Sequence, residues 1–95
     1  MRINYSGCAI CDSTWGDHWE EVDGERRFFC CALCARQFRA LLARIRATTG
    51  WSTLEELVIA GDRRGRTCTV SSRSGTARFS FAFNSEGALR EFGSA

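Results

Sequence analysis

Four cysteines near the start of the chain constrain its fold more than any other feature. Cys8 and Cys11 are separated by two residues, and a second group, Cys30, Cys31 and Cys34, follows about twenty residues later. Two thiolates in a C-x2-C pair reach one tetrahedral ion from a tight turn, with each sulfur about 2.3 Å from a zinc ion. Two pairs of this kind predict a structural zinc site that holds one Zn2+ per chain.

The sequence allows the second pair to be chosen in two ways. Cys30-x3-Cys34 and Cys31-x2-Cys34 both place the last ligand in the first turn of a helix that is predicted to begin near Cys31. A helix N-terminus favours negative charge and therefore stabilises a zinc tetrathiolate. From the residues alone, Cys8, Cys11 and Cys34 are ligands, and the remaining ligand is either Cys30 or Cys31.

The length of the chain, 95 residues, predicts a single domain over residues 1–95 whose small core benefits from a bound metal. No apolar run approaches the roughly 18 residues that span a bilayer, and the first residues lack the apolar stretch of a signal peptide. These features predict a cytoplasmic protein with no membrane partner. In a reducing compartment, paired cysteines indicate metal binding rather than disulfides.

The segment that carries the cysteines predicts a knuckle, a hairpin and a helix. Two strand-like runs flank Asp23-Gly24, a dipeptide that suits a hairpin turn needing two positive φ angles; the runs are residues 18–22 and 25–29. Apolar residues then recur every three or four positions over residues 31–48, which indicates an amphipathic helix. This order predicts a zinc-binding, treble-clef-like part over residues 5–48.

Residues 50–95 predict an α+β part with a β-hairpin. Ser52-x-x-Glu55 has the pattern of a capping box, and Phe79, Phe81 and Phe83 alternate as in a strand with one buried face. The predicted elements are a helix over 52–60, a loop over 61–65, strands over 67–71 and 77–83 joined at 74–75, and a helix over 86–92. The predicted fold class is α+β in two layers, with the treble-clef-like part packed on a helix-hairpin-helix part.

The sequence FCCALCARQF, residues 29–38, resembles the aromatic-Cys-x3-Cys-x3-Phe segment of TRASH and YHS-type zinc fingers. Cys8-x2-Cys11 is similar to the first TRASH pair, so the resemblance covers about residues 5–45. It implies Cys8, Cys11, Cys30 and Cys34 as the ligands, whereas the adjacent Cys31 departs from the pattern and remains the alternative to Cys30. In that family such modules are associated with metal sensing, metal trafficking or protein contacts.

The predicted function is that of a protein–protein interaction module or an accessory, non-catalytic subunit of a larger complex. Aromatic and arginine side chains are enriched in protein interfaces, and the chain carries several large aromatics between residues 15 and 51: Trp15, Trp19, Phe28, Phe29 and Trp51. Autonomous catalysis is not expected, because one histidine and a closed four-cysteine site offer neither a positioned base nor an open metal position.

Two other functions remain open. The family resemblance implies a metal sensor or metal trafficking protein. The second open function is that of a nucleic-acid-binding zinc finger. A stripe of arginines can neutralise phosphates, and one face of the predicted helix carries four: Arg36, Arg39, Arg44 and Arg46. Against nucleic acid, the net charge is only +2, and the first 25 residues hold six acidic residues and one arginine.

Overall fold

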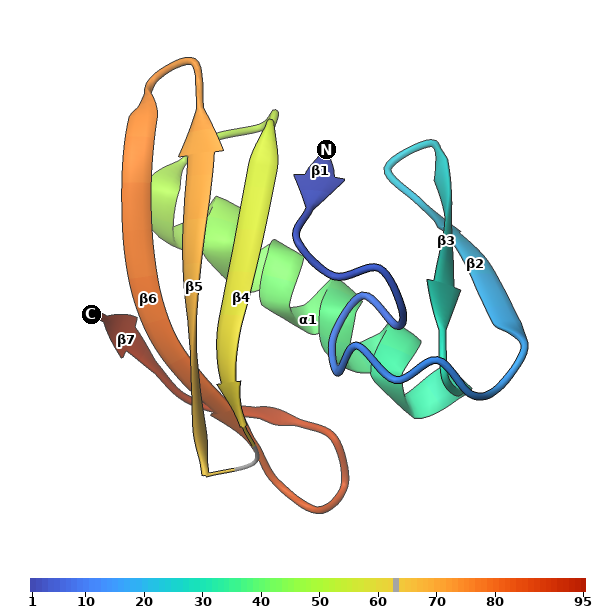
Figure 1. The fold of residues 1–95 in the computed structure, drawn as a ribbon. Helices are drawn as coiled ribbons and strands as arrows, with labels where there is room; N and C mark the ends of the chain where they lie inside the picture. The colour runs from blue at the N-terminus through green and yellow to red at the C-terminus, as the bar shows by residue number, and fades with distance from the viewer. Residues whose placement is uncertain (63) are drawn as a thin grey trace.

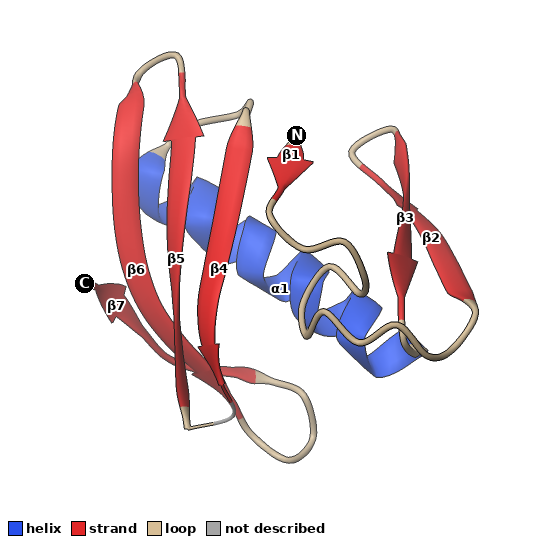
Figure 2. Cartoon of the chain, in the orientation of Figure 1, coloured by secondary structure: helices blue, strands red, loops and turns tan. Residues whose placement is uncertain are grey.

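The computed structural model describes residues 1–62 and 64–95, which form one helix and seven strands (Figures 1 and 2). In chain order these are β1 (Arg2–Ile3), β2 (His18–Val22), β3 (Glu25–Phe29), α1 (Ala32–Thr49), β4 (Glu56–Asp62), β5 (Gly65–Ser72), β6 (Gly75–Phe83) and β7 (Leu89–Ser94). One sheet has the strand order β1-β4-β5-β6-β7, and β2 and β3 form a separate hairpin. The helix α1 lies across one face of the five-stranded sheet and reaches the hairpin at its N-terminal end (Figure 1).

The predicted fold class is wrong. Among the described residues, 50–95 hold strands and no helix, so the chain is mainly β and is not a treble-clef-like part packed on a helix-hairpin-helix part. The segment predicted as a helix over 52–60 instead forms β4, and the segment predicted as a helix over 86–92 instead contributes to β7. In β4, Leu57 and Ile59 are buried and alternate with exposed Val58 and Ala60, which is the two-residue period of a strand.

The first predicted hairpin and the long helix are confirmed. The strands β2 and β3 pair antiparallel about Asp23 and Gly24, whose φ angles are 55° and 80°. The helix ends at Gly50, which has a left-handed φ of 77° and donates its N–H to the carbonyl of Arg46. Both features follow from short-range turn chemistry, which the sequence displays directly.

The second predicted hairpin is also confirmed, with longer strands. The strands β5 and β6 pair from Arg66 opposite Phe81 to Ser72 opposite Gly75, so the turn is Arg73-Ser74 rather than 74–75. On the other side, β4 and β5 extend into the predicted loop over 61–65, of which Arg63 lies outside the described residues.

One buried cluster joins the two sheets and the helix. The inner stripe of α1 contributes Phe38, Leu41 and Ile45, each fully buried, and it packs with inward-facing sheet residues such as Leu57 and Phe81. No helix in the part of the chain that the structure describes is long and apolar enough to cross a membrane.

The N-terminal segment is fixed to the large sheet just before the first cysteine pair. After the two residues of β1, the Asn4 amide continues the pairing with β4: its Nδ2 donates to the Ile59 carbonyl at 2.9 Å, and its Oδ1 accepts from the Ile59 N–H at 2.8 Å. The amide thus satisfies two backbone groups at the edge of the sheet. This contact sets where the chain leaves the sheet toward Cys8.

Candidate metal centre

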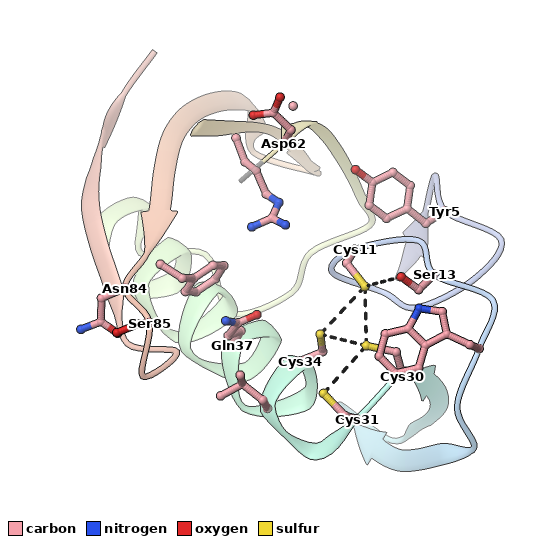
Figure 3. Close-up of a pocket in the computed structure, with 15 residues that line it drawn as sticks. Tyr5, Cys11, Ser13, Cys30, Cys31, Cys34, Gln37, Asp62, Asn84 and Ser85 are labelled. Carbon is pink, nitrogen blue, oxygen red and sulfur yellow. Dashed lines mark hydrogen bonds between the residues drawn. The ribbon is translucent and has the colours of Figure 1, made fainter. Parts of the chain in front are cut away.

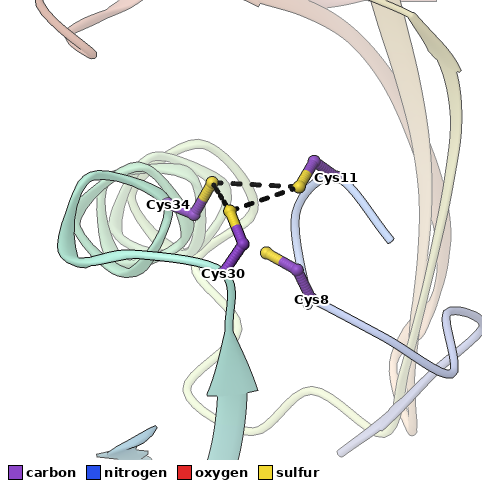
Figure 4. Close-up of side chains that lie close together, drawn as sticks. All are labelled: Cys8, Cys11, Cys30 and Cys34. Carbon is purple, nitrogen blue, oxygen red and sulfur yellow. Dashed lines mark hydrogen bonds between the residues drawn. The ribbon is translucent and has the colours of Figure 1, made fainter. Parts of the chain in front are cut away.

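Three segments of the chain carry the clustered cysteines (Figure 4). Cys8 and Cys11 lie in a tight turn between β1 and β2, in which the Asp12 N–H donates to the Cys8 carbonyl and the Cys8 N–H donates to the Ser13 carbonyl, both at 2.9 Å. Cys30 directly follows β3, and Cys34 lies in the first turn of α1. The knuckle, the hairpin and the helix therefore each contribute to one small volume.

The four sulfur atoms of Cys8, Cys11, Cys30 and Cys34 all lie within 4.8 Å of one another. The Sγ–Sγ distances are 3.6 Å from Cys11 to Cys30, 3.3 Å from Cys30 to Cys34 and 4.0 Å from Cys34 to Cys11. A tetrahedral ion bound at 2.3 Å separates its sulfur ligands by about 3.8 Å. The donor set therefore fits a thiophilic tetrahedral ion, and all six cysteines of the chain are free.

The electrostatics of the cluster also suit a cation. A hydrogen bond from the Cys34 thiol, with further bonds from the backbone N–H groups of Ile10, Cys30 and Cys11, lowers the pKa of Cys8 to about 4. The same thiol contact raises the pKa of Cys34, and burial raises the pKa of Cys30 to about 12. The pKa shifts thus disfavour ionisation of Cys30 and Cys34 beside the Cys8 thiolate, whereas a divalent ion would supply charge that stabilises several thiolates together.

The two remaining cysteines lie outside this group. Cys31, the alternative to Cys30, is half-buried, and its Sγ lies 3.8 Å from the Cys30 Sγ without joining the four mutually close sulfurs. Cys68 is buried on β5, and burial raises its pKa to about 11, which fits a core thiol. The structure therefore groups Cys30, and not Cys31, with the other three cysteines.

A cavity of about 780 Å³ opens beside the cysteines (Figure 3). Its walls include the thiol-bearing residues Cys11, Cys30, Cys31 and Cys34 on one side, and residues from the ends of the large sheet, among them Asp62, Asn84 and Ser85, on the other. Cys8 is fully buried and does not line the cavity. The cavity thus gives access to the side of the cluster where Cys11, Cys30 and Cys34 lie.

Two charged residues of the cavity wall, Asp62 and Arg66, were not predicted from the sequence. Arg66 pairs opposite Phe81 in the sheet. It lies two residues before Cys68 and four before Val70, both buried, so it shares their face of β5, which is the helix-facing side. A charged residue at an inward position of a strand is a signal that the sequence already carried. Arg66 was missed because the predicted strand began at Thr67, whereas β5 begins at Gly65.

The arginine stripe of α1 is largely occupied by contacts within the chain. Arg39 pairs with Glu20 at 2.7 Å, Arg46 hydrogen-bonds Asp23 with Nη1–Oδ1 at 3.2 Å, and the Arg44 guanidinium lies 5.5 Å from the Phe92 ring centre. The Arg46 hydrogen bond also lowers the pKa of Asp23. Of the four arginines predicted to contact nucleic acid, Arg36 alone has no such contact among the described residues.

The large aromatics divide between core and surface. Phe29 is fully buried, while Phe28 and Trp51 are half-buried. Trp15 is 63% exposed and lies in the segment that joins the cysteine turn to β2. Trp19 is 50% exposed and lies on β2 itself. These two side chains are the most exposed large aromatics and are available to a partner, although Trp19 already contacts Phe28 and Arg26.

Comparison with known proteins gives one match. A family model described as Ta0938 matches residues 5–95, a range that contains all six cysteines and every strand except β1. No curated protein and no solved structure matches the chain. These comparisons do not test the resemblance to TRASH and YHS-type zinc fingers, which stays a prediction.

Proposed function

The chain belongs to the Ta0938 family, and we propose that it is a small zinc-binding protein in which Cys8, Cys11, Cys30 and Cys34 hold one structural Zn2+. The observation that carries the proposal is the mutual approach of four free thiols within 4.8 Å. Zinc is the favoured ion because closed four-sulfur sites of this spacing are typical of structural zinc. Free thiols in this number also suit a reducing compartment such as the cytoplasm.

The proposed role of the ion is structural rather than catalytic. Four sulfurs complete the tetrahedron, so no position remains for a water or a substrate. The ion would connect the cysteine turn, the end of β3 and the start of α1, three segments that otherwise meet around Ile10 and Phe29. A chain of this size gains most from such a connection because its core is small.

Replacing Cys30 and Cys31 separately by serine tests the ligand set. Cys30→Ser is expected to lose zinc to a chelator concentration that the unchanged protein withstands, because only three sulfurs of the mutually close group remain to hold the ion. Cys31→Ser is expected to keep about one zinc per chain, since its sulfur lies outside the group of four. Elemental analysis of both purified variants and of the unchanged protein gives the ratio, and zinc loss from Cys31→Ser alone would contradict the proposed set.

We further propose that the ion supports an interaction surface, so that the chain acts as a non-catalytic module or accessory subunit bound to another protein. Trp15 and Trp19 support this, because they are the most exposed of the large hydrophobic residues and tryptophan is frequent in binding hot spots. A nucleic-acid partner is not favoured, because three arginines of the α1 stripe already contact other parts of the chain.

A double variant, Trp15→Ala with Trp19→Ala, tests the interaction surface. The expected result is that a protein recovered in stoichiometric amount with the tagged chain from its own host is lost from the double variant, because hot-spot tryptophans each contribute about 2 kcal/mol or more to binding. Val58→Ala is the matched control, since Val58 is 38% exposed and lies on the sheet face away from α1. Retention of the partner by the double variant would contradict the proposed interaction surface.

A further inference from the structure

The thiol of Cys31 lies beside the four-sulfur cluster without belonging to it. Its Sγ is 3.8 Å from that of Cys30, which is close to the spacing within the cluster itself, where Cys11 and Cys30 are 3.6 Å apart. Cys30 and Cys31 are neighbours in the chain, at the junction of β3 and α1. Cys31 therefore places a fifth sulfur beside the cluster, at a spacing from Cys30 similar to that between cluster sulfurs.

Cys31 also lies on the accessible side of the cluster. The cavity of about 780 Å³ is lined by Cys11, Cys30, Cys31 and Cys34, whereas Cys8 is fully buried behind them. Figure 3 shows the Cys31 sulfur next to that of Cys30, in the wall of this cavity. A molecule that gives zinc to the cluster or takes it away would approach through the cavity and meet the Cys31 thiol there.

We propose that Cys31 is an exchange ligand, which replaces Cys30 on the zinc ion while the ion enters or leaves through the cavity. The proposal rests on the zinc site proposed above and deepens it. In the exchange step a Zn–S bond to Cys31 forms and the Zn–S bond to Cys30 breaks. The Cys31 thiol releases its proton to solvent, the Cys30 sulfur takes one up, and zinc stays divalent throughout.

The chemistry of zinc permits this step. Zinc has no geometric preference from its d electrons, so one thiolate could replace another on the ion without any change of oxidation state. A thiol held 3.8 Å from the ligand that it replaces also acts at a high effective concentration. The two spacings in the sequence, Cys30-x3-Cys34 and Cys31-x2-Cys34, then describe two successive states of one site rather than two competing assignments.

The rate of zinc transfer to a colorimetric pyridylazo chelator tests the proposal. Cys31→Ser is expected to hold about one zinc per chain and to transfer it at least about tenfold more slowly than the unchanged protein, because the neighbouring thiol is gone. Serine is a favoured residue before a helix, so α1 should keep its start in this variant. Ala32→Ser is the matched control: it adds a hydroxyl at an exposed neighbouring position, keeps the Cys31 thiol and should leave the rate within roughly twofold.

Each other outcome has a separate meaning. Equal or faster transfer from zinc-loaded Cys31→Ser, with Cys31→Ala giving the same result, would overturn the exchange role and leave the structural zinc site intact. Loss of zinc from folded Cys31→Ser would also overturn it, because Cys31 would then be a permanent ligand. Absence of zinc from the unchanged protein, measured by elemental analysis, would overturn both proposals together.

Discussion

Removing the metal with a strong chelator is expected to unfold the chain at room temperature. A domain of this size is stable by about 5–15 kcal/mol, and a structural zinc site contributes about 10–16 kcal/mol of apparent binding free energy near neutral pH. The free energy lost with the metal is therefore as large as, or larger than, the whole free energy of unfolding. Circular dichroism and thermal melting, with and without the chelator, measure the effect, and added zinc should restore the folded signal.

The position of the cysteine cluster explains why removing the metal should unfold the whole chain and not only the cysteine turn. Cys8, Ala9 and Ile10 are all buried, and they belong to the same core cluster as Phe29 and the inner stripe of α1. Loss of the ion would remove the bonds that hold the cysteine turn, the end of β3 and the start of α1 to this core.

Cys8→Ser should reproduce the effect of the chelator, because it removes the most deeply buried ligand. Ala32→Ser, on an exposed position of the same region, should melt like the unchanged protein. If the metal-free protein melts within a few degrees of the metal-bound protein, the structural role is wrong, and the ion would instead bind to a fold that is already complete.

The parts of the fold that the sequence predicted well are those decided by neighbouring residues. The Asp23-Gly24 turn, the stripe of α1 and its stop at Gly50 each depend on a few adjacent positions. The same is true of the cysteine pairs, because the spacing from Cys8 to Cys11 already limits how far their sulfurs can separate. The structure then brings the pairs together, but the ion itself and its identity stay predictions.

The predictions that were wrong concern elements whose structure depends on residues far away in the sequence. The strand β4 exists because it pairs with β1 on one side and β5 on the other, and Ser52-x-x-Glu55 gave no sign of these partners. A cap is worth about 1 kcal/mol, whereas seven paired residues with Leu57 and Ile59 buried are worth more. Local propensity therefore lost to tertiary pairing.

The prediction for the end of the chain was wrong for a related reason. A helix was predicted over 86–92, but the Asn84 side chain forms a turn there: its Oδ1 accepts from the N–H groups of Glu86 and Ala88, both at 2.9 Å. The chain then returns as β7, and Phe92 stacks on Phe79 with ring centres 4.8 Å apart. A side chain that bonds the backbone in this way competes with helix formation, and a distant aromatic contact decides the result.

Phe38→Ala is expected to destabilise the chain by about 3–5 kcal/mol, the usual loss for a buried phenylalanine that leaves a cavity. Phe38 is fully buried on α1, and its ring centre lies 5.6 Å from that of Phe29. At about 4–8 °C per kcal/mol for a chain of this length, Tm should fall by at least about 12 °C. Leu33→Ala, at a 39% exposed position of the same helix, is the control and should cost under about 1 kcal/mol.

The same substitution connects the core to the metal site. Phe29 is followed directly by the ligand Cys30, so a cavity beside the Phe29 ring removes the packing that holds the end of β3 in place. Phe38→Ala should therefore give up zinc to a competing chelator at a lower chelator concentration than Leu33→Ala does. Because the ion stabilises the fold and the fold orders the ligands, the two effects are linked and should change together. A Phe38→Ala protein that melts early but holds zinc as tightly as the control would show that the cysteine cluster is independent of the helix–hairpin core.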